Sequence, residues 1–446
     1  MHYFVTAYGA VGDGITSDTK AVQATIDACG AAGGGKVIIE PGHTHLIGTI
    51  HLRSKVELVV KRGGKILLSG VREDFEETRF SGPQRFGIMA DSVEDVAISG
   101  AGEINGNDEA WVNEKLPHIY RMRRGWPFMI GFFHCRNVSM HNIKIKNAPC
   151  WTVVFSECDN VDVSGISILN NVLVPCNDGI DIDHSRFVRI TNSHFECGDD
   201  CIVLKTHHSF DGTGPCENIT VTNCTMISRS FAINLGCEVL APIRNCIFSN
   251  CVIKNSHRGV GVHLSNHSNI ENVIFSDMYI ETRYYDPDWW GAAEPIYVVA
   301  IPWTNNDSVG YIKNIKFSNI ICCSENGVIV YGHDTALIDG VTFDNITVHI
   351  DKFTDEEEGG RYDLRPCEGE DNGRGAGVFM HDTAGFFIRN AKNVDIRNSV
   401  VTWGENRPEY FGYALEAEQA ENLQLINFRG THANGCEEQA LFVKAP

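Results

Sequence analysis

The sequence has no long apolar run and little positive charge. No stretch of its 446 residues approaches the roughly twenty consecutive apolar residues that a membrane-spanning helix needs. Its net charge is −20, whereas nucleic acids and anionic membrane surfaces attract faces rich in Lys and Arg. We therefore expect neither a nucleic acid nor a membrane as partner. With 43% hydrophobic and 21% charged residues, the composition indicates a folded globular protein.

Patterns for metal binding and for disulfides are also missing. The sixteen cysteines include no CxxC pair and no His/Cys spacing suited to zinc. Many cysteines occupy apolar positions, as Cys224, Cys246 and Cys251 do, so we expect most of them to be small buried side chains. The sequence predicts no metal and no other cofactor.

The N-terminus carries no recognisable export signal. MHYFVTAYGAVGDG has no basic region, no apolar core and no small-residue cleavage site. We therefore expect a cytoplasmic protein. The alternative is a secreted or periplasmic protein whose signal has been removed.

Two short alternating strands, joined at Asn, Ser or Gly, recur along most of the chain. Each strand alternates apolar and polar residues, which is typical of a half-buried β-strand. The base period is in the twenties, with a few longer intervals. The copies start at Glu94, Arg136, Asp159, Arg186, Glu217, Arg244, Glu271, Lys313, Asp339, Lys392 and Glu421.

A repeat this short cannot bury its apolar side chains within one copy, so successive copies must stack into a continuous core. We therefore predict an all-β fold, a right-handed parallel β-helix that spans residues 1–446 as a single domain. A β-propeller is the main alternative. Its blades take about forty residues and four strands each, which the short period excludes.

The two kinds of segment outside the repeat have different predicted roles. Residues 1–50 predict an N-terminal cap, with a helix that begins near Ser17 or Asp18 and a Gly-Gly-Gly turn into a strand from Lys36. Insertions in solenoids usually collect on the binding face, so we expect the longer intervals to wall a pocket. These insertions lie near residues 106–135, 283–312 and 351–391.

Five aspartates crowd into the stretch from Cys176 to Thr206. One acidic turn, Asn-Asp-Gly, contains Asp178, and the other, Gly-Asp-Asp, contains Asp199 and Asp200, 21 residues further along. That distance is close to one coil of the predicted solenoid, so the turns would stack on successive coils, roughly 4.8 Å apart. Three carboxylates would then share one patch.

Such a patch suits the hydrolysis of a glycosidic bond. Like charges held close raise the pKa of one carboxyl group, which keeps a proton available for donation while a neighbour stays ionised. The acid can protonate the leaving oxygen and the carboxylate can activate water. The candidate catalytic residues are Asp178, Asp199 and Asp200.

These motifs resemble those of glycoside hydrolase family 28, the polygalacturonases and their relatives, and the resemblance covers essentially the whole chain. The family's NTDGID and GDDCI motifs occur here as CNDGID from Cys176 and GDDCI from Gly198, and the opening AYGAVGDGITSDT and the NAPCW around Pro149 are similar as well. The resemblance implies an inverting hydrolase in which Asp199 is the general acid and Asp178 and Asp200 hold the attacking water. The residues alone do not make that assignment, because it depends on the distance between acid and base.

Two of the family's motifs are absent. In place of Gly-His-Gly the chain has Ser230-Phe231-Ala232, and in place of Arg-Ile-Lys it has Gly261-Val262-His263. The resemblance implies that this Arg and Lys grip the carboxylate of galacturonate, and a Gly/His pair cannot supply two fixed positive charges. We therefore expect poor activity on unsubstituted polygalacturonan. Arg258, three residues earlier, is the candidate for a partial replacement.

Further polar and aromatic side chains are candidates for contacts with a sugar. Histidines flank the acidic turns, a lysine follows GDDCIVL, and the second insertion carries aromatic rings of the kind on which sugar rings stack. The alternative for each is a structural role in a loop or in a small core beneath it. The candidate substrate-binding residues are Asn177, His184, Lys205, His207, Glu238, Arg258, His263, Trp289, Trp290 and Trp303.

The sequence thus favours an inverting glycoside hydrolase whose partner is an oligosaccharide or polysaccharide. We expect it to act on an α-linked pectin-type or related glycan, at chain ends or on oligosaccharides, because the insertions would close the groove into a pocket. One alternative is a β-helical polysaccharide lyase or epimerase, which needs an Arg or Lys as base, a role that only Lys205 could take among residues near the acidic turns. The other is a non-catalytic β-helix that binds glycans.

Overall fold

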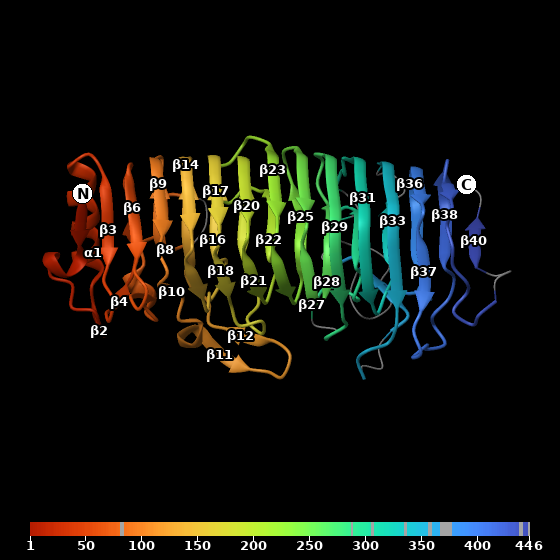
Figure 1. Cartoon of the computed structure of the whole chain (residues 1–446), viewed down its shortest axis with the longest axis horizontal. Helices are drawn as coiled ribbons and strands as arrows, with labels where there is room; N and C mark the ends of the chain where they lie inside the picture. Colours follow the sequence, from red (N-terminus) through yellow and green to blue (C-terminus); the bar gives the residue numbers. More distant parts are fainter. Residues whose placement is uncertain are drawn as a thin grey trace. The chain divides into compact units, whose positions relative to one another are not determined.

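The computed structural model describes residues 1–80, 84–286, 289–304, 307–333, 337–355, 359–365, 377–436 and 440–444. The chain divides into two compact units. The first consists of Met1–Val203 and His207–Cys224, and the second of Leu204–Thr206 and Thr225–Pro446. Within each unit, parallel strands stack as successive coils, which confirms the predicted right-handed parallel β-helix (Figure 1). The single-domain organisation stays a prediction.

A cap begins the first unit. The short 3-10 helix η1 (Val5–Tyr8) is followed by α1 (Thr19–Ala31), which starts directly after Asp18, as predicted. Asp18 accepts hydrogen bonds from the backbone N–H groups of Val11 and Gly12 and lies 2.7 Å from Nδ1 of the buried His45. These contacts fasten the opening loop to the first coils.

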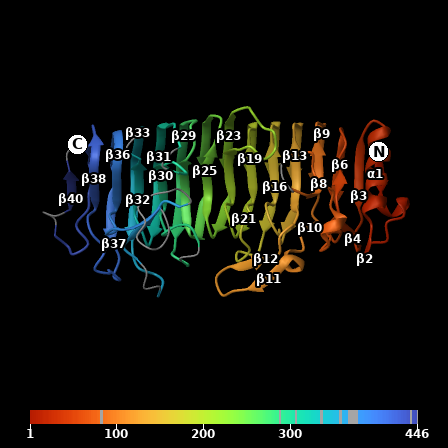
Figure 2. The same cartoon turned by 180° about the vertical axis from the view of Figure 1, so that it is seen from behind.

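Apart from the strands of one insertion, the described strands of the first unit form three parallel ladders. The first ladder contains β5 (Ile50–His51), β8 (Phe86–Asp91), β13 (Phe128–Phe133), β16 (Val153–Ser156) and β19 (Ile180–Asp183). The second contains β1 (His2–Phe4), β3 (Gly35–Ile39), β6 (Val56–Val60), β9 (Glu94–Ser99), β14 (Arg136–His141), β17 (Asp159–Ser164), β20 (Arg186–Thr191) and β23 (Cys216–Thr222). The third contains β2 (Asp13–Ser17), β4 (Thr44–Ile47), β7 (Lys65–Leu68), β10 (Glu103–Asn105), β15 (Lys144–Lys146), β18 (Ser167–Leu169) and β21 (His194–Cys197). Figure 2 shows β8, β13, β16 and β19 as neighbours.

The second unit continues the pattern with longer strands, several of which run through two ladders. Strand β22 (Ile202–Thr206) contains the boundary between the units. The strands of the second unit are β24 (Thr225–Ser228), β25 (Phe231–Val239), β26 (Ile243–Ser249), β27 (Val252–Ser256), β28 (Arg258–Leu264), β29 (Ile270–Thr282), β30 (Ile296–Ala300), β31 (Tyr311–Ser324), β32 (Val328–Gly332), β33 (Leu337–Ile350), β36 (Phe386–Arg397), β37 (Val400–Trp403), β38 (Leu415–Glu421), β39 (Gln424–Ile426) and β40 (Leu441–Lys444).

The register of the strands reproduces the repeat found in the sequence. In the second ladder of the first unit, the first residues of successive copies pair directly with one another: Glu94, Arg136, Asp159, Arg186 and Glu217. The same holds in the second unit for Arg244, Glu271, Lys313, Asp339, Lys392 and Glu421. One copy of the repeat is therefore one coil, insertions aside.

Side chains that point inward form continuous apolar stacks. In the second unit the rings of Phe248, Phe275, Phe317 and Phe343 stack with centroids 4.9, 5.1 and 5.1 Å apart. Burying each such ring stabilises the fold by roughly 1.5–3 kcal/mol. Eleven of the fifteen described cysteines are buried, and all fifteen are free thiols, as expected of small core residues.

The predicted insertions form small elements outside the coils. The short helices η2 (Arg72–Asp74) and η3 (Asp108–Trp111) lie between coils of the first unit. The insertion near 106–135 also contains the antiparallel pair β11 (Val112–Lys115) and β12 (Tyr120–Met122), which extends away from the coils (Figure 1). The described part of the insertion near 351–391 contains the antiparallel pair β34 (Arg361–Asp363) and β35 (Val378–Met380). In the described part of the chain, no helix combines the length and the apolar character that crossing a membrane requires.

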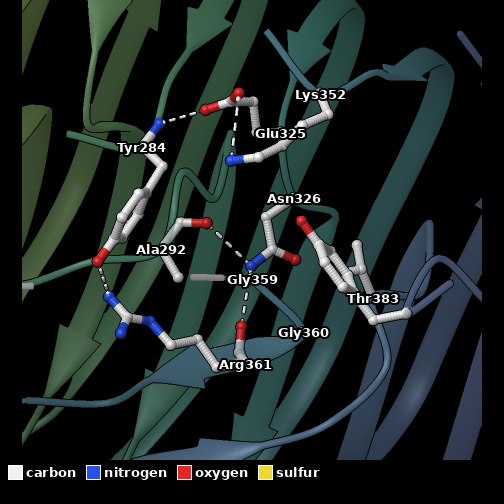
Figure 3. Close-up of a pocket in the computed structure, with 10 residues that line it drawn as sticks. Tyr284, Ala292, Glu325, Asn326, Lys352, Gly359, Gly360, Arg361 and Thr383 are labelled. Atoms are coloured by element: carbon white, nitrogen blue, oxygen red, sulfur yellow. Dashed lines mark hydrogen bonds and ion pairs between the residues drawn. The ribbon is translucent and has the colours of Figure 1, made fainter. Parts of the chain in front are cut away.

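Buried polar groups fasten the insertions of the second unit to its coils. The Glu325 carboxylate accepts backbone N–H groups of Tyr284 and Phe353, both at 2.6 Å. Asn326 donates from Nδ2 to the carbonyl oxygens of Ala292, at 2.9 Å, and Arg361, at 3.1 Å. Figure 3 shows these side chains converging on a small pocket from separate segments. These hydrogen bonds thus fasten the described parts of the insertions to the coils.

Candidate active site

Two acidic turns of the first unit bring three carboxylates together. Asp178 lies two residues before β19, and Asp199 and Asp200 lie shortly before β22. One oxygen atom of each carboxylate lies within 4.8 Å of those of the other two. Asp178 is 3% and Asp200 6% exposed, and Asp199 is half-buried. The predicted stacking of the two turns into one acidic patch is therefore confirmed.

Asn177 joins the two turns. Its Oδ1 accepts a hydrogen bond from the Gly198 N–H at 2.5 Å, and its Nδ2 donates to the carbonyl oxygen of Asn171 at 2.9 Å. The residue is fully buried, with both amide atoms engaged by the backbone. The structure therefore corrects the prediction that Asn177 contacts substrate, because its side chain holds the turns together.

Two glycines allow this close approach. A Cβ atom at Gly179 would lie 2.3 Å from the carbonyl oxygen of Cys201, and one at Gly198 would lie 2.1 Å from that of Val174. Real Cβ atoms essentially never come within 3.0 Å of another heavy atom in this way. The Gly179 N–H also donates to the carbonyl oxygen of Asp200 at 2.8 Å. The glycines therefore set the spacing of the carboxylates.

Backbone N–H groups orient the Asp199 carboxylate. Cys176 donates to its Oδ2 at 3.2 Å, and Asp200 donates to its Oδ1 at 3.0 Å. The three carboxylates are also close enough to hold one cation, although exposed acidic groups are common without an ion. The 4.8 Å joins one oxygen atom of each carboxylate, whereas about 6.5–9.5 Å separates the carboxyl groups of typical inverting hydrolases, so this distance does not by itself assign inversion.

A buried carboxylate at the end of β19 holds the loop after β22. Asp183 accepts hydrogen bonds from the Ser156 hydroxyl at 2.7 Å and from the backbone N–H of His207 at 3.1 Å, and its Oδ1 lies 3.3 Å from Nδ1 of the same histidine. Burial opposes the ionisation of Asp183, but the bond from His207 and the charges of His207 and His184 outweigh it and lower its pKa. Asp183 thus stays a carboxylate inside the protein.

The two histidines predicted as sugar contacts are largely buried. His184 is 5% exposed, and its ring nitrogens face the carbonyl oxygens of Gly214 and His207. The structure therefore corrects its predicted contact with sugar, because the side chain binds to the backbone of the neighbouring loop. His207 is 6% exposed and lies flat against the indole of Trp151, with ring centroids 5.4 Å apart and planes inclined by 22°. His207 therefore supports an aromatic surface.

Trp151 belongs to a group of apolar side chains that we call the aromatic wall. The wall combines side chains of β8, β13 and β16, which belong to the coils that precede the acidic turns, with Phe80 and Phe210. Its members are Phe80, Phe86, Met89, Phe133, Val154 and Phe210, with Phe128 and Trp151 packed against them.

Lys205 and Glu238 lie together in the second unit. The Lys205 Nζ is 4.0 Å from Oε2 of Glu238, on neighbouring segments of β22 and β25. The Lys205 side chain is 10% and that of Glu238 38% exposed, so the pair meets the solvent mainly through Glu238. Their predicted contact with substrate stays a prediction.

Arg258 is buried in the second unit, which corrects its predicted role. The side chain is 1% exposed, its Nε lies 3.1 Å from Oε2 of the fully buried Glu294, and it donates to the carbonyl oxygen of Asp363. Its guanidinium also lies over the rings of Phe231 and Tyr297, at 4.8 and 4.4 Å from their centroids. In this position Arg258 pairs with protein groups and cannot meet the carboxylate of a sugar.

His263 is buried as well. It is 1% exposed and packs edge-on against Tyr297, and burial followed by the charge of Arg258 lowers its pKa to about 3. The ring is therefore neutral at ordinary pH. The structure corrects its predicted contact with substrate, because the insertions of this unit cover the face to which β28 contributes.

The predicted tryptophans differ in exposure. Trp289 is 5% exposed, and its carbonyl oxygen accepts a hydrogen bond from Arg365, so it pins the insertion near 283–312 as a core residue rather than facing sugar. Trp290 is 48% exposed and Trp303 is partly exposed. These two remain candidates for stacking on sugar rings.

Asp183 and Trp151 are site features that the list of candidates omitted. Asp181 and Asp183 alternate along β19 and so lie on the same face, which is a signal that the sequence does contain. Trp151 aligns with Asp178 on the next coil, since Thr152 donates to the carbonyl oxygen of Asp178 at 2.9 Å. Only knowledge of the register reveals that neighbourhood.

Comparison with known proteins agrees with this geometry. The model of the glycosyl hydrolases family 28 matches residues 36–359. Polygalacturonase-2 of Solanum lycopersicum is 28% identical over 71% of this chain and 67% of its own length, and a probable polygalacturonase of Vitis vinifera is 27% identical over 57% and 55%. The matching part of the chain thus spans between about half and two thirds of these relatives.

Two solved structures share the fold. The exopolygalacturonase of Thermotoga maritima is similar with a TM-score of 0.60 and 22% identity over 95% of this chain and 92% of its own. The family 28 exopolygalacturonase of Yersinia enterocolitica gives a TM-score of 0.67 with 17% identity over 95% and 78%. Because the family model covers well over half of the sequence, the chain belongs to the glycosyl hydrolases of family 28 and is a polygalacturonase-like glycoside hydrolase.

Proposed function

We propose that this hydrolase cleaves an α-linked pectin-type or related glycan with inversion, and that it acts at chain ends or on oligosaccharides rather than on unsubstituted polygalacturonan. The observation that carries the proposal is the group of three carboxylates at two stacked turns of the first unit, with oxygens within 4.8 Å of one another. Their neighbours Gly179 and Gly198 make that arrangement possible.

The three carboxylates have separate roles in the proposed reaction. Asp199, oriented by two backbone N–H groups, gives its proton to the glycosidic oxygen as the bond from that oxygen to the anomeric carbon breaks. Asp178 and Asp200 hold a water molecule, which attacks the anomeric carbon from the opposite face and passes its proton to one of these carboxylates. Exchange with solvent returns the proton to Asp199.

The charge of the second unit supports a substrate other than plain polygalacturonan. Positions 261 and 263 on β28 hold a glycine and a buried neutral histidine, and Arg258 is neutralised by Glu294. None of these described groups offers a free positive charge to a galacturonate carboxylate. Binding a chain of carboxylates without such partners costs the desolvation of each one.

The aromatic wall supports action at chain ends. On the coils before the acidic turns it packs aromatic rings together, such as Phe80 against Phe133 at 4.5 Å and Phe86 against Phe128 at 4.9 Å. A long polymer that runs through the site needs an open face on both sides of the cleaved bond. We infer that the wall limits the space on one side of the site, so that a short stretch of sugars is bound there.

A panel of pectin-derived polymers and oligosaccharides tests the proposal. We expect single short products from the chain ends, released with inverted configuration at the anomeric carbon as followed by NMR, and little product from unsubstituted polygalacturonan. A spread of intermediate sizes from a long polymer would refute action at chain ends. Rapid hydrolysis of plain polygalacturonan would refute the proposed preference.

Variants test the catalytic assignment on the best substrate of the panel. Asp178→Asn, Asp199→Asn and Asp200→Asn should each lower kcat at least about a hundredfold, since general acid–base groups contribute about 10²–10⁴. Asp162→Asn, an exposed aspartate on β17, is the matched control and should keep wild-type activity. Activity in Asp199→Asn equal to the wild type would show that another group supplies the proton.

A further inference from the structure

Trp151 lies beside the acidic turns of the first unit. It directly precedes Thr152, whose N–H donates to the carbonyl oxygen of Asp178 at 2.9 Å, so Trp151 and Asp178 are at equivalent positions on neighbouring coils. Its own carbonyl oxygen accepts a hydrogen bond from Met129 on the preceding coil at 3.1 Å. Trp151 is half-buried, so part of the residue meets the solvent.

Neighbouring aromatic side chains fix the orientation of the Trp151 indole. His207 covers one side of it at 5.4 Å and 22°, while Phe128 and Phe210 contact it at steeper angles of 59° and 67°. A nearly parallel contact on one side with tilted contacts at the edges holds a ring in one plane. The indole therefore presents a fixed surface.

His207 is in turn held by a buried carboxylate. Asp183, which is fully buried, contacts both the backbone N–H and Nδ1 of His207, and it is itself bonded by the Ser156 hydroxyl. A hydrophobic core that served only to fill space would need no ionised group at this point, because burying one is costly. The pairing with His207, together with the Ser156 hydroxyl and the charge of His184, offsets the cost of burying this carboxylate.

We propose that Trp151 is the stacking surface of the sugar subsite beside Asp178, and that Asp183 and His207 are positioning residues that hold its indole in place. The ligand is a pyranose ring of the substrate glycan, whose apolar face would lie against the indole. The inference rests on the proposed function, since it adds a subsite to the same active site.

Kinetics on short oligosaccharides prepared from pectin test the subsite. Trp151→Leu should raise KM about tenfold with a smaller change in kcat, which corresponds to the loss of one aromatic contact. Trp151→Phe keeps a flat ring and should recover most of the affinity. Asp183→Asn and His207→Gln should raise KM in the same sense, because the indole is no longer held, while their kcat stays near that of the wild type.

Two controls separate positioning from a loss of fold. His194→Gln, whose partly exposed side chain lies beside Glu196 on β21, is the matched histidine control and should leave KM unchanged. Binding is measured independently in the Asp199→Asn background, where the same oligosaccharides should change tryptophan fluorescence. Adding Trp151→Phe to that background should remove most of the change.

The outcomes separate this inference from the proposed function. If the wild type cleaves the oligosaccharides while Trp151→Leu keeps a KM within about twofold of the wild type, the subsite is refuted and the hydrolase proposal stands. If Asp183→Asn lowers the melting temperature but leaves KM unchanged, the positioning role is refuted. If the wild type neither cleaves nor binds any oligosaccharide of the panel, both proposals fall.

Discussion

Removing one charge from the buried pair Arg258–Glu294 should strongly destabilise the second unit. The two side chains are 1% and 0% exposed and lie 3.1 Å apart. Glu294→Gln keeps the size of the side chain and can still accept the N–H of Ala292, but it leaves the guanidinium without its main counter-charge. Breaking a buried pair in this way costs about 3–5 kcal/mol.

The neighbourhood of Arg258 places the expected cost at the lower end of that range. The fully buried Asp363 also interacts electrostatically with Arg258, although Arg365 shares its carboxylate at 2.6 Å. We therefore expect a loss of about 3 kcal/mol. For a unit of this size, each kcal/mol shifts the melting temperature by about 2–4 °C, so calorimetry should show a decrease of about 6–12 °C.

Two variants control this measurement. Asp159→Asn removes the partner of Arg186 in a pair that is 34% and 52% exposed, which should cost less than about 1 kcal/mol. The double variant Arg258→Met/Glu294→Leu removes both charges and should recover most of the loss, because no charge is left unpaired. A shift for Glu294→Gln no larger than that for Asp159→Asn would refute the reasoning.

Three further predictions concern the site and its surroundings. Gly198→Ala should lower the free energy of unfolding by about 1–3 kcal/mol and reduce turnover, since its Cβ would meet the Val174 carbonyl oxygen. Gly214→Ala is the control, because its Cβ would lie 3.5 Å from the nearest atom, Oε2 of Glu157. This variant should keep wild-type behaviour in thermal melts and activity assays. Burial and then the charge of Arg258 lower the pKa of His263 to about 3, so the folded protein keeps this ring neutral, whereas the unfolded chain binds a proton to it below about pH 6.5. The free energy of unfolding should therefore fall as the pH drops from 6.5 towards 3. Urea titrations of His263→Gln should show a smaller fall over the same range. Trp290→Ala should weaken sugar binding in titration calorimetry without changing the melting temperature. Trp289→Ala, which empties a buried position, should lower the free energy of unfolding by about 3–5 kcal/mol. The opposite pattern would show that the two roles are reversed.

The coils could be predicted from the sequence because the repeat is short and its pattern is strict. Coils that share one alternating pattern can bury their apolar side chains together in only one strand register. Residues that begin successive copies, such as Glu94 and Arg136, must therefore pair. The acidic turns followed from the same reasoning, since 21 residues is close to one coil. Asp178, Asp199 and Asp200 therefore came together as predicted.

The surroundings of the site could not be predicted in this way. Arg258 and His263 lie on β28, between the copies of the repeat that start at Arg244 and Glu271, and the repeat does not show what covers them. The group that covers Arg258 includes Asp363, which is 105 residues further along the chain and lies within an insertion. Asn177 and His184 failed for a different reason, because polar side chains at tight turns often bond to the backbone, and their sequence neighbourhood does not distinguish that role from binding.

Asn177, Gly179 and Gly198 make the placement of the carboxylates independent of the choice of substrate. The positions of the carboxylates depend on contacts of the main chain and of Asn177 between two adjacent coils, whereas the aromatic wall beside them consists of side chains from strands and loops. A change in a loop side chain can therefore alter which sugar fits without moving the acid or the base. Substrate preference in such a chain can diverge by replacing surrounding side chains alone, while the bond-breaking step depends on the few hydrogen bonds that join the two turns.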